Sequence, residues 1–154
     1  MGEQLLDTWQ IHNRINLYLL EAIAPAALAG VPTSKGRSVG EIFAHVHNVR
    51  LMWLQASAPE LMEGLAKIEK EDAAEKERLH RSLEESGRAV EALLRKGIEG
   101  GGKIKGFKPH AVAFLGYLIS HESYHVGEIG MTLTQSGYPL EKKIAYGIWE
   151  WGVR

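Results

Sequence analysis

The feature that most restricts the fold of this 154-residue chain is the spacing of its apolar residues, which follows the α-helical period in four long segments. Apolar residues about 3.6 positions apart share one side of a helix, so each segment can bury one face. The predicted helices cover approximately residues 3–24, 38–57, 72–96 and 109–135. No segment shows the alternation of a convincing β-strand. The pattern therefore predicts an all-α protein, and four such helices pack as a four-helix bundle.

Proline, glycine and capping residues predict where these helices begin and end. Pro25 stops the first helix. Ser38 and Glu41 have the spacing of a capping box, in which each side chain bonds the backbone N–H of the other residue. Pro109 suits the first turn of the fourth helix, and Gly137 suits the position after its last turn.

The last segment, residues 137–154, is dense in aromatic side chains: Tyr138, Tyr146, Trp149 and Trp151. Such a tail has to cover either the body of its own chain or a partner subunit. Packing onto the bundle is the simpler expectation.

The composition excludes several classes of protein. A chain that is 45% hydrophobic and 24% charged, of this length, is typical of one globular domain, which we expect to span residues 1–154. A net charge of −1 gives no strong field toward nucleic acid or an anionic membrane. The absence of cysteine excludes disulfides, thiolate metal sites and cysteine nucleophiles. With no basic leader and no apolar stretch of roughly 18 residues, we expect a cytoplasmic protein without a membrane partner.

The residues with the clearest chemical meaning are His121, Glu122 and His125 in the fourth helix. Side chains four positions apart lie on one helical face, so the two imidazoles can converge on a metal ion, in the pattern H-E-x-x-H. The alternative is a pair of ordinary, partly buried histidines. Glu122 falls near the middle of the inward face, where a carboxylate needs a partner. It is a candidate proton acceptor, or a group that orients a metal-binding imidazole.

A third metal ligand has to come from another helix, and His45 is the best candidate. On a wheel of 100° per residue, His45 lies roughly 75° from the centre of its buried stripe, whereas His47 lies roughly 125° away and should face solvent or the rim of the core. Three imidazoles leave a fourth position for water, as in catalytic zinc sites. Zinc or nickel is the first expectation, because all-imidazole sites suit several first-row metals. We expect His12 at the edge of the core and His80 at the surface.

Two other functions stay open. In a metallopeptidase of the H-E-x-x-H type, Glu122 would be the general base. The extended form of that motif has glycine and histidine where Glu128 and Met131 stand here, and no strand is available to bind a peptide. In a non-enzymatic, stress-related bundle, the helices would serve oligomer contacts and the histidines would be satisfied polar groups.

Two motifs are similar to signatures of the DinB/YfiT-like family: GEIFAHV at residues 40–46, and LISHESYHVGEI at residues 118–129 followed by QSG at 135–137. The resemblance runs in order over nearly the whole chain. It implies an up-down-down-up four-helix bundle, often a homodimer, with a divalent metal on three histidines. The family's ligand positions fall on His45, His121 and His125.

The resemblance also implies a class of reaction. Family members with an assigned activity include metal-dependent transferases and isomerases that use low-molecular-weight thiols. We therefore expect a thiol transferase or a hydrolase that acts on a small molecule. The expected partners are this substrate and, for a transferase, a low-molecular-weight thiol. The family name refers to DNA damage and does not imply DNA binding. This sequence has Val126 where the family often has arginine, and Glu128 where it often has glutamine; Glu128 either stiffens the site or lies exposed.

Overall fold

The computed structural model describes residues 1–154, and its architecture is all-helical. Four long helices, α1 (Gly2–Ala22), α2 (Val39–Ser57), α3 (Lys76–Glu99) and α4 (Ala111–Gln135), are followed by the short α5 (Lys142–Gly147). Single 3-10 turns occur at Pro25–Ala29, Pro59–Met62, Lys70–Asp72 and Trp151–Val153. The only β-type pairing is an isolated bridge between Ile104 and Phe107. The prediction of an all-α protein is confirmed.

Local signals set most of the helix ends as predicted. The capping box of α2 is complete: the Glu41 N–H donates to Ser38 Oγ at 3.1 Å, and the Ser38 N–H donates to Glu41 Oε1 at 3.3 Å. After α4, Gly137 has a φ of +90°, a left-handed conformation that glycine adopts without strain. The next N–H, that of Tyr138, donates back to the Leu133 carbonyl at 2.8 Å and closes the last turn.

Two predicted helix starts differ from the structure. The third helix begins at Lys76 and not near residue 72, because Lys70–Asp72 forms a separate 3-10 turn. The fourth helix begins at Ala111, so Pro109 lies before it and not in its first turn. His110 is the N-cap, where its ring Nδ1 accepts a hydrogen bond from the Ala113 N–H at 3.1 Å.

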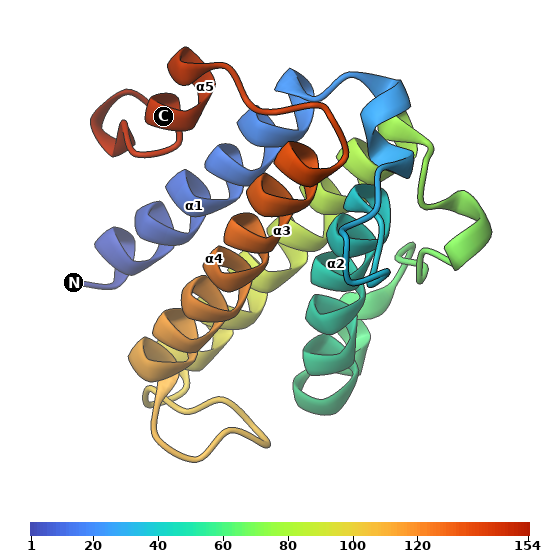
Figure 1. Ribbon diagram of the computed structural model, residues 1–154. Coiled ribbons are helices and arrows are strands. Elements are labelled where there is room, and N and C mark those ends of the chain that lie inside the picture. The colour runs from blue at the N-terminus through green and yellow to red at the C-terminus, as the bar shows by residue number, and fades with distance from the viewer.

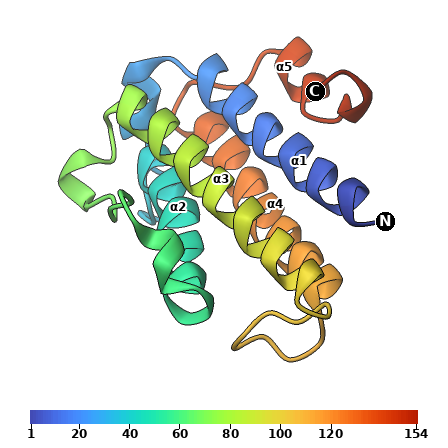
Figure 2. The ribbon, with the colours of Figure 1, turned by 180° about the vertical axis from the view of Figure 1, so that it is seen from behind.

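The four long helices pack side by side, and α1 and α2 lie on opposite sides of the pair formed by α3 and α4 (Figure 1, Figure 2). Each of these outer helices contacts both α3 and α4. The connection between α2 and α3 runs back along the outer side of α2. Two hydrogen bonds hold it there, from Asn48 Nδ2 to the Ile68 carbonyl and from the Ile68 N–H to Asn48 Oδ1. Consequently α2 and α3 begin at the same end of the molecule (Figure 1).

The core consists of two apolar clusters with a buried polar layer between them. One cluster includes Leu20, Phe43, Leu79 and Leu133. The other includes Trp9, Leu54, Leu94 and Phe114. Along every long helix, one or two buried polar residues fall between the parts that enter the two clusters: His12, Asn16, His47, Arg50, Ser86, Glu122 and His125.

The C-terminal tail, residues 138–154, folds back beside α1 (Figure 1). Its aliphatic residues Leu140, Ile144 and Ile148 pack against the first apolar cluster. The guanidinium of Arg154 lies 3.7 Å from the centre of the Tyr18 ring. The tail's aromatic residues stay largely in solvent, with Trp149 76% exposed. None of the helices is apolar over enough length to cross a membrane.

Candidate metal centre

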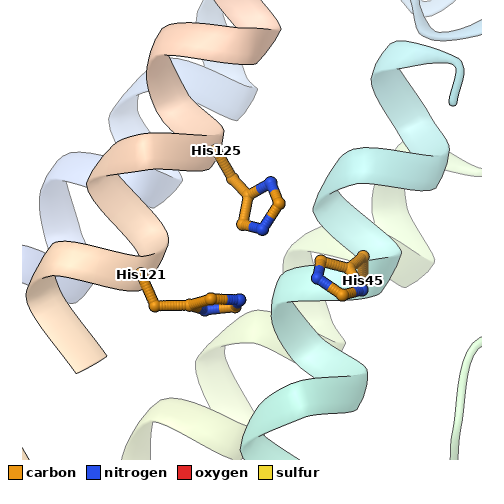
Figure 3. Close-up of side chains that lie close together, drawn as sticks. All are labelled: His45, His121 and His125. Atoms are coloured by element: carbon orange, nitrogen blue, oxygen red, sulfur yellow. The ribbon is translucent and has the colours of Figure 1, made fainter. Parts of the chain in front are cut away.

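Three histidines from two helices converge at one point on the side of the bundle. His45 lies on α2, and His121 and His125 lie one turn apart on α4 (Figure 3). Each ring offers one nitrogen such that all three nitrogens lie within 4.8 Å of one another. The His125 ring centroid is 4.6 Å from that of His45 and 4.6 Å from that of His121. The structure therefore brings together the three residues that the sequence singled out as metal ligands, and their spacing could accommodate a metal ion.

The surroundings of the cluster favour neutral imidazoles, the form that binds metals. The pKa of His45 is lowered to about 4, chiefly by burial and then by the charges of Arg37 and the two other histidines. Burial, followed by the charge of His125, also lowers the pKa of His121. Near neutral pH both rings are therefore uncharged and carry a free lone pair.

Glu128 fixes the orientation of one ring. Its Oε1 lies 2.9 Å from His125 Nδ1. A carboxylate can only accept, so the proton sits on Nδ1 and the lone pair on Nε2. Hydrogen bonds of this kind commonly orient metal-binding histidines. Of the two alternatives weighed for Glu128, the contact with His125 is the one formed, although the Glu128 side chain remains 38% exposed.

His121 supplies a separate test of whether a cation fits. Its Nδ1 is buried and has no hydrogen-bond partner within the protein. Buried polar nitrogens are rarely left in this state. The protein alone therefore does not satisfy this ring, and three imidazole nitrogens within 4.8 Å of one another suit a divalent transition metal in ligand type.

Glu122 lies in the buried polar layer, where several side chains bind it. Arg50 donates from Nε to Oε2 at 2.8 Å and from Nη2 to Oε1 at 2.6 Å. His12 Nε2 and Asn16 Nδ2 lie 3.0 and 2.9 Å from Oε1. Burial alone would raise the pKa of Glu122, but the charge and hydrogen bonds of Arg50, helped by His12, lower it to about 2. No hydrogen bond joins Glu122 to the three clustered histidines.

Arg50 is the important residue that sequence reasoning missed. Its side chain is fully buried, and Nη1 also donates to the Leu83 carbonyl at 3.0 Å and to Ser86 Oγ at 3.2 Å. The signal was present in the sequence: Arg50 lies four residues after Val46 and four before Leu54, inside the apolar stripe of α2. A charged residue at such a position predicts a buried ion pair.

The prediction for His47 is wrong. Its side chain is only 1% exposed, and Nε2 lies 2.8 Å from the Ala66 carbonyl. The helical wheel assumed one buried face, whereas the returning connection covers the second side of α2. His12 is more deeply buried than a core-edge residue, at 3% exposure. His80 lies at the surface as expected, with Nε2 2.7 Å from Glu21 Oε1.

The protein is thus all-helical and brings together three histidines from two helices that could hold a metal ion. The sequence model of the DinB family matches residues 1–149, and the chain belongs to this family. No match was found among curated proteins or among solved structures.

Proposed function

We propose that this protein is a metal-dependent enzyme that acts on a small molecule by group transfer or hydrolysis, with transfer to or from a low-molecular-weight thiol as the first candidate reaction. The observation that carries the proposal is the convergence of His45, His121 and His125 within 4.8 Å. A bound zinc or nickel ion would act as a Lewis acid and would hold a water, thiolate or carbonyl oxygen.

The remaining residues of the site have positioning roles in this proposal. Glu128 holds the His125 ring with Nε2 free. Glu122, next to His121 in the chain, is bound on both oxygens by Arg50 of α2. This ion pair ties α4 to α2, the two helices that carry the histidines, and so supports the spacing between them.

The arrangement of Glu122 counts against the metallopeptidase alternative. A general base has to reach a water or substrate proton with a free lone pair. Glu122 is buried and its oxygens are occupied by Arg50, His12 and Asn16. Freeing it would leave Arg50 as an unpaired buried charge, which is costly.

The unpartnered nitrogen of His121 counts against a non-enzymatic bundle whose histidines merely satisfy one another. The proposal also includes the finer architecture that the family resemblance implies: one domain over residues 1–154, up-down-down-up helix order, a packed tail, and a homodimer. The contacts of α1 and α2 with both inner helices support the bundle. Light scattering on the purified protein tests the dimer.

Metal analysis tests the site directly. Protein purified without a His-tag should contain a single equivalent of a divalent transition metal per chain. His125→Ala should lose most of it, because that ring stands nearest to both others. His80→Ala, a surface histidine, is the matched control and should keep its metal. Equal losses from the two variants would show that the ligand set is wrong.

An activity assay separates the candidate reactions. The metal-loaded protein should transfer common cellular thiols to electrophilic acceptors, and His45→Ala should abolish this activity together with metal binding. Activity on peptides alone would favour the peptidase. A metal-free protein with no activity would favour the non-enzymatic bundle whose helices serve oligomer contacts.

A further inference from the structure

A second feature of the molecule is an open cavity of about 420 Å³ lined by α1, α4 and the C-terminal tail. Ligand pockets in proteins typically have volumes of roughly 300–1,000 Å³, so this space suits a small molecule. We propose that the cavity binds a small, largely aromatic molecule.

The cavity lies on the opposite face of α4 from the three clustered histidines. Its α4 wall includes Ser123, Gly127 and Gly130. At about 100° per residue, these positions point away from His121 and His125, and none of the clustered histidines lines the cavity. Occupation of the cavity therefore does not depend on a metal, and the two proposals can succeed or fail separately.

The walls are mainly apolar and include aromatic rings. Ile15 of α1 faces Leu140, Ile148, Trp149 and Trp151 of the tail across the cavity. Trp149 and Trp151 line it while remaining 76% and 36% exposed, so their rings are only partly used by the protein itself. Flat apolar rings of this kind favour a planar aromatic ligand, through offset stacking and edge contacts.

Two helical glycines keep the α4 wall open. A Cβ added at Gly127 or Gly130 would meet no atom within 4 Å. The wall at these positions is bare backbone, with free space in front of it. Larger side chains there would fill the cavity from the α4 side without disturbing the packing of the protein, which makes these positions suitable for a test.

Two polar residues of α1 also lie at the cavity wall. His12 and Asn16 line it, and Asn16 is 3% exposed. Asn16 Nδ2 faces Glu122 Oε1 at 2.9 Å, and because a carboxylate only accepts, the amide orientation is fixed. Asn16 Oδ1 is then left buried without a partner. This oxygen is shielded from the cavity by the protein itself, so the apolar and aromatic walls determine which ligand fits.

The test uses N-phenyl-1-naphthylamine, an uncharged aromatic amine with one N–H donor, whose fluorescence rises in apolar surroundings. Titration of the full-length protein should show saturable binding at a single site. Gly130→Leu should weaken it at least about tenfold, because a helical leucine side chain covers the preceding turn and so enters the cavity. Gly116→Leu is the matched control: this α4 glycine also has open space before it but lies outside the cavity, and binding should be unchanged.

Three further measurements sharpen the result. Trp149→Ala, which removes an exposed wall residue, should also weaken binding. The N-methylated probe, which lacks the N–H donor, should bind about as tightly, because the apolar and aromatic walls recognise the rings. His125→Ala should bind the probe as wild type does.

The proposal is overturned if the wild-type protein shows no saturable binding, or if Gly130→Leu and Gly116→Leu bind alike. A third outcome also overturns it: the wild type is a dimer that does not bind the probe, and light scattering shows that Gly130→Leu, but not Gly116→Leu, is a monomer. That result would assign the cavity to a second copy of the chain.

Discussion

The residues at the centre of the molecule are charged, which is unusual for the space between two apolar clusters. Arg50 and Glu122 are 0% and 1% exposed and are joined by two hydrogen bonds. The guanidinium also lies 4.9 Å from the centre of the Trp9 ring. Buried charges are tolerated only when all their hydrogen-bonding capacity is used. Arg50 therefore fixes the relative positions of α2, α3 and α4, because its hydrogen bonds form only in one arrangement of these helices. Apolar contacts alone would allow several arrangements.

Removal of Arg50 should destabilise the protein strongly. Arg50→Ala leaves the Glu122 carboxylate buried without its cation, and breaking a pair of this kind costs about 3–5 kcal/mol. The matched control is Arg78→Ala, since Arg78 forms a 2.9 Å pair with Asp72 near the surface. That substitution should cost less than about 1 kcal/mol. Urea unfolding measures both, and equal effects would show that the buried pair is not specially important.

Glu122 should also make stability depend on pH. Its pKa is about 2 in the folded protein, below the ordinary value of 4.5. A lowered pKa means that the ionised carboxylate stabilises the folded state. This stabilisation is complete above the ordinary pKa and is lost as the pH falls toward the pKa of the folded protein. In metal-free protein, the difference in unfolding free energy between wild type and Glu122→Gln should therefore shrink between about pH 4.5 and 2. Glu63→Gln, at an exposed position, should show no such change.

At the scale of the helices, the features that depend on residues close together in the chain could be predicted from the sequence. The capping box at Ser38 and the i, i+4 histidine pair are local patterns, and both have the predicted geometry. His45 followed from the wheel of α2 because it borders the same stripe. The burial of His47 did not, since it depends on the connection between α2 and α3, whose path no local pattern reveals.

The contacts of Arg50 and Glu128 show the same limit within the candidate site. Glu128 lies three residues from His125, so the sequence shows that the two side chains can meet. It does not show that the carboxylate binds the imidazole and not water. The partner of Arg50 is 72 residues away in the chain, on α4. Its position in an apolar stripe predicts burial, while the identity of its partner requires the packing of two helices.

The capping box of α2 gives a prediction at this scale. Ser38→Ala removes the acceptor for the Glu41 N–H and should reduce the unfolding free energy by about 1 kcal/mol. Ser34→Ala, in the exposed turn just before, is the control and should have almost no effect. Chemical denaturation followed by circular dichroism measures the difference. A loss at Ser34 as large as that at Ser38 would contradict the assignment.

At the scale of the whole molecule, the tail packs onto the outside of the bundle, and none of its residues belongs to either buried apolar cluster. It touches α1 through a small number of contacts: Arg14 Nη2 donates to the Arg154 carbonyl at 3.1 Å, and Arg154 stacks on Tyr18. Gly147 lies directly against the same tyrosine. Together with the aliphatic residues that pack on the first apolar cluster, this close approach holds the tail, which forms one wall of the cavity between α1 and α4.

A methyl group at that point should detach the tail without unfolding the bundle. In Gly147→Ala the added Cβ would overlap Tyr18 Oη and lie 2.7 Å from its Cζ, so either the tyrosine or the tail has to move. Because Arg154 packs on the same ring, displacement of Tyr18 also breaks that contact. Trypsin should then cleave after Lys142 and Lys143 several-fold faster, since cleavage requires local opening of α5.

The matched control is Gly152→Ala in the same tail, where a Cβ meets no atom within 4 Å and the cleavage rate should equal that of wild type. The urea midpoint of Gly147→Ala should stay close to that of wild type, because the two apolar clusters and the polar layer between them do not include Gly147. If cleavage and midpoint change together, the tail unfolds with the bundle and is an integral part of the core. If cleavage alone accelerates, the tail opens without unfolding of the bundle. A ligand can then enter the cavity by displacing the tail.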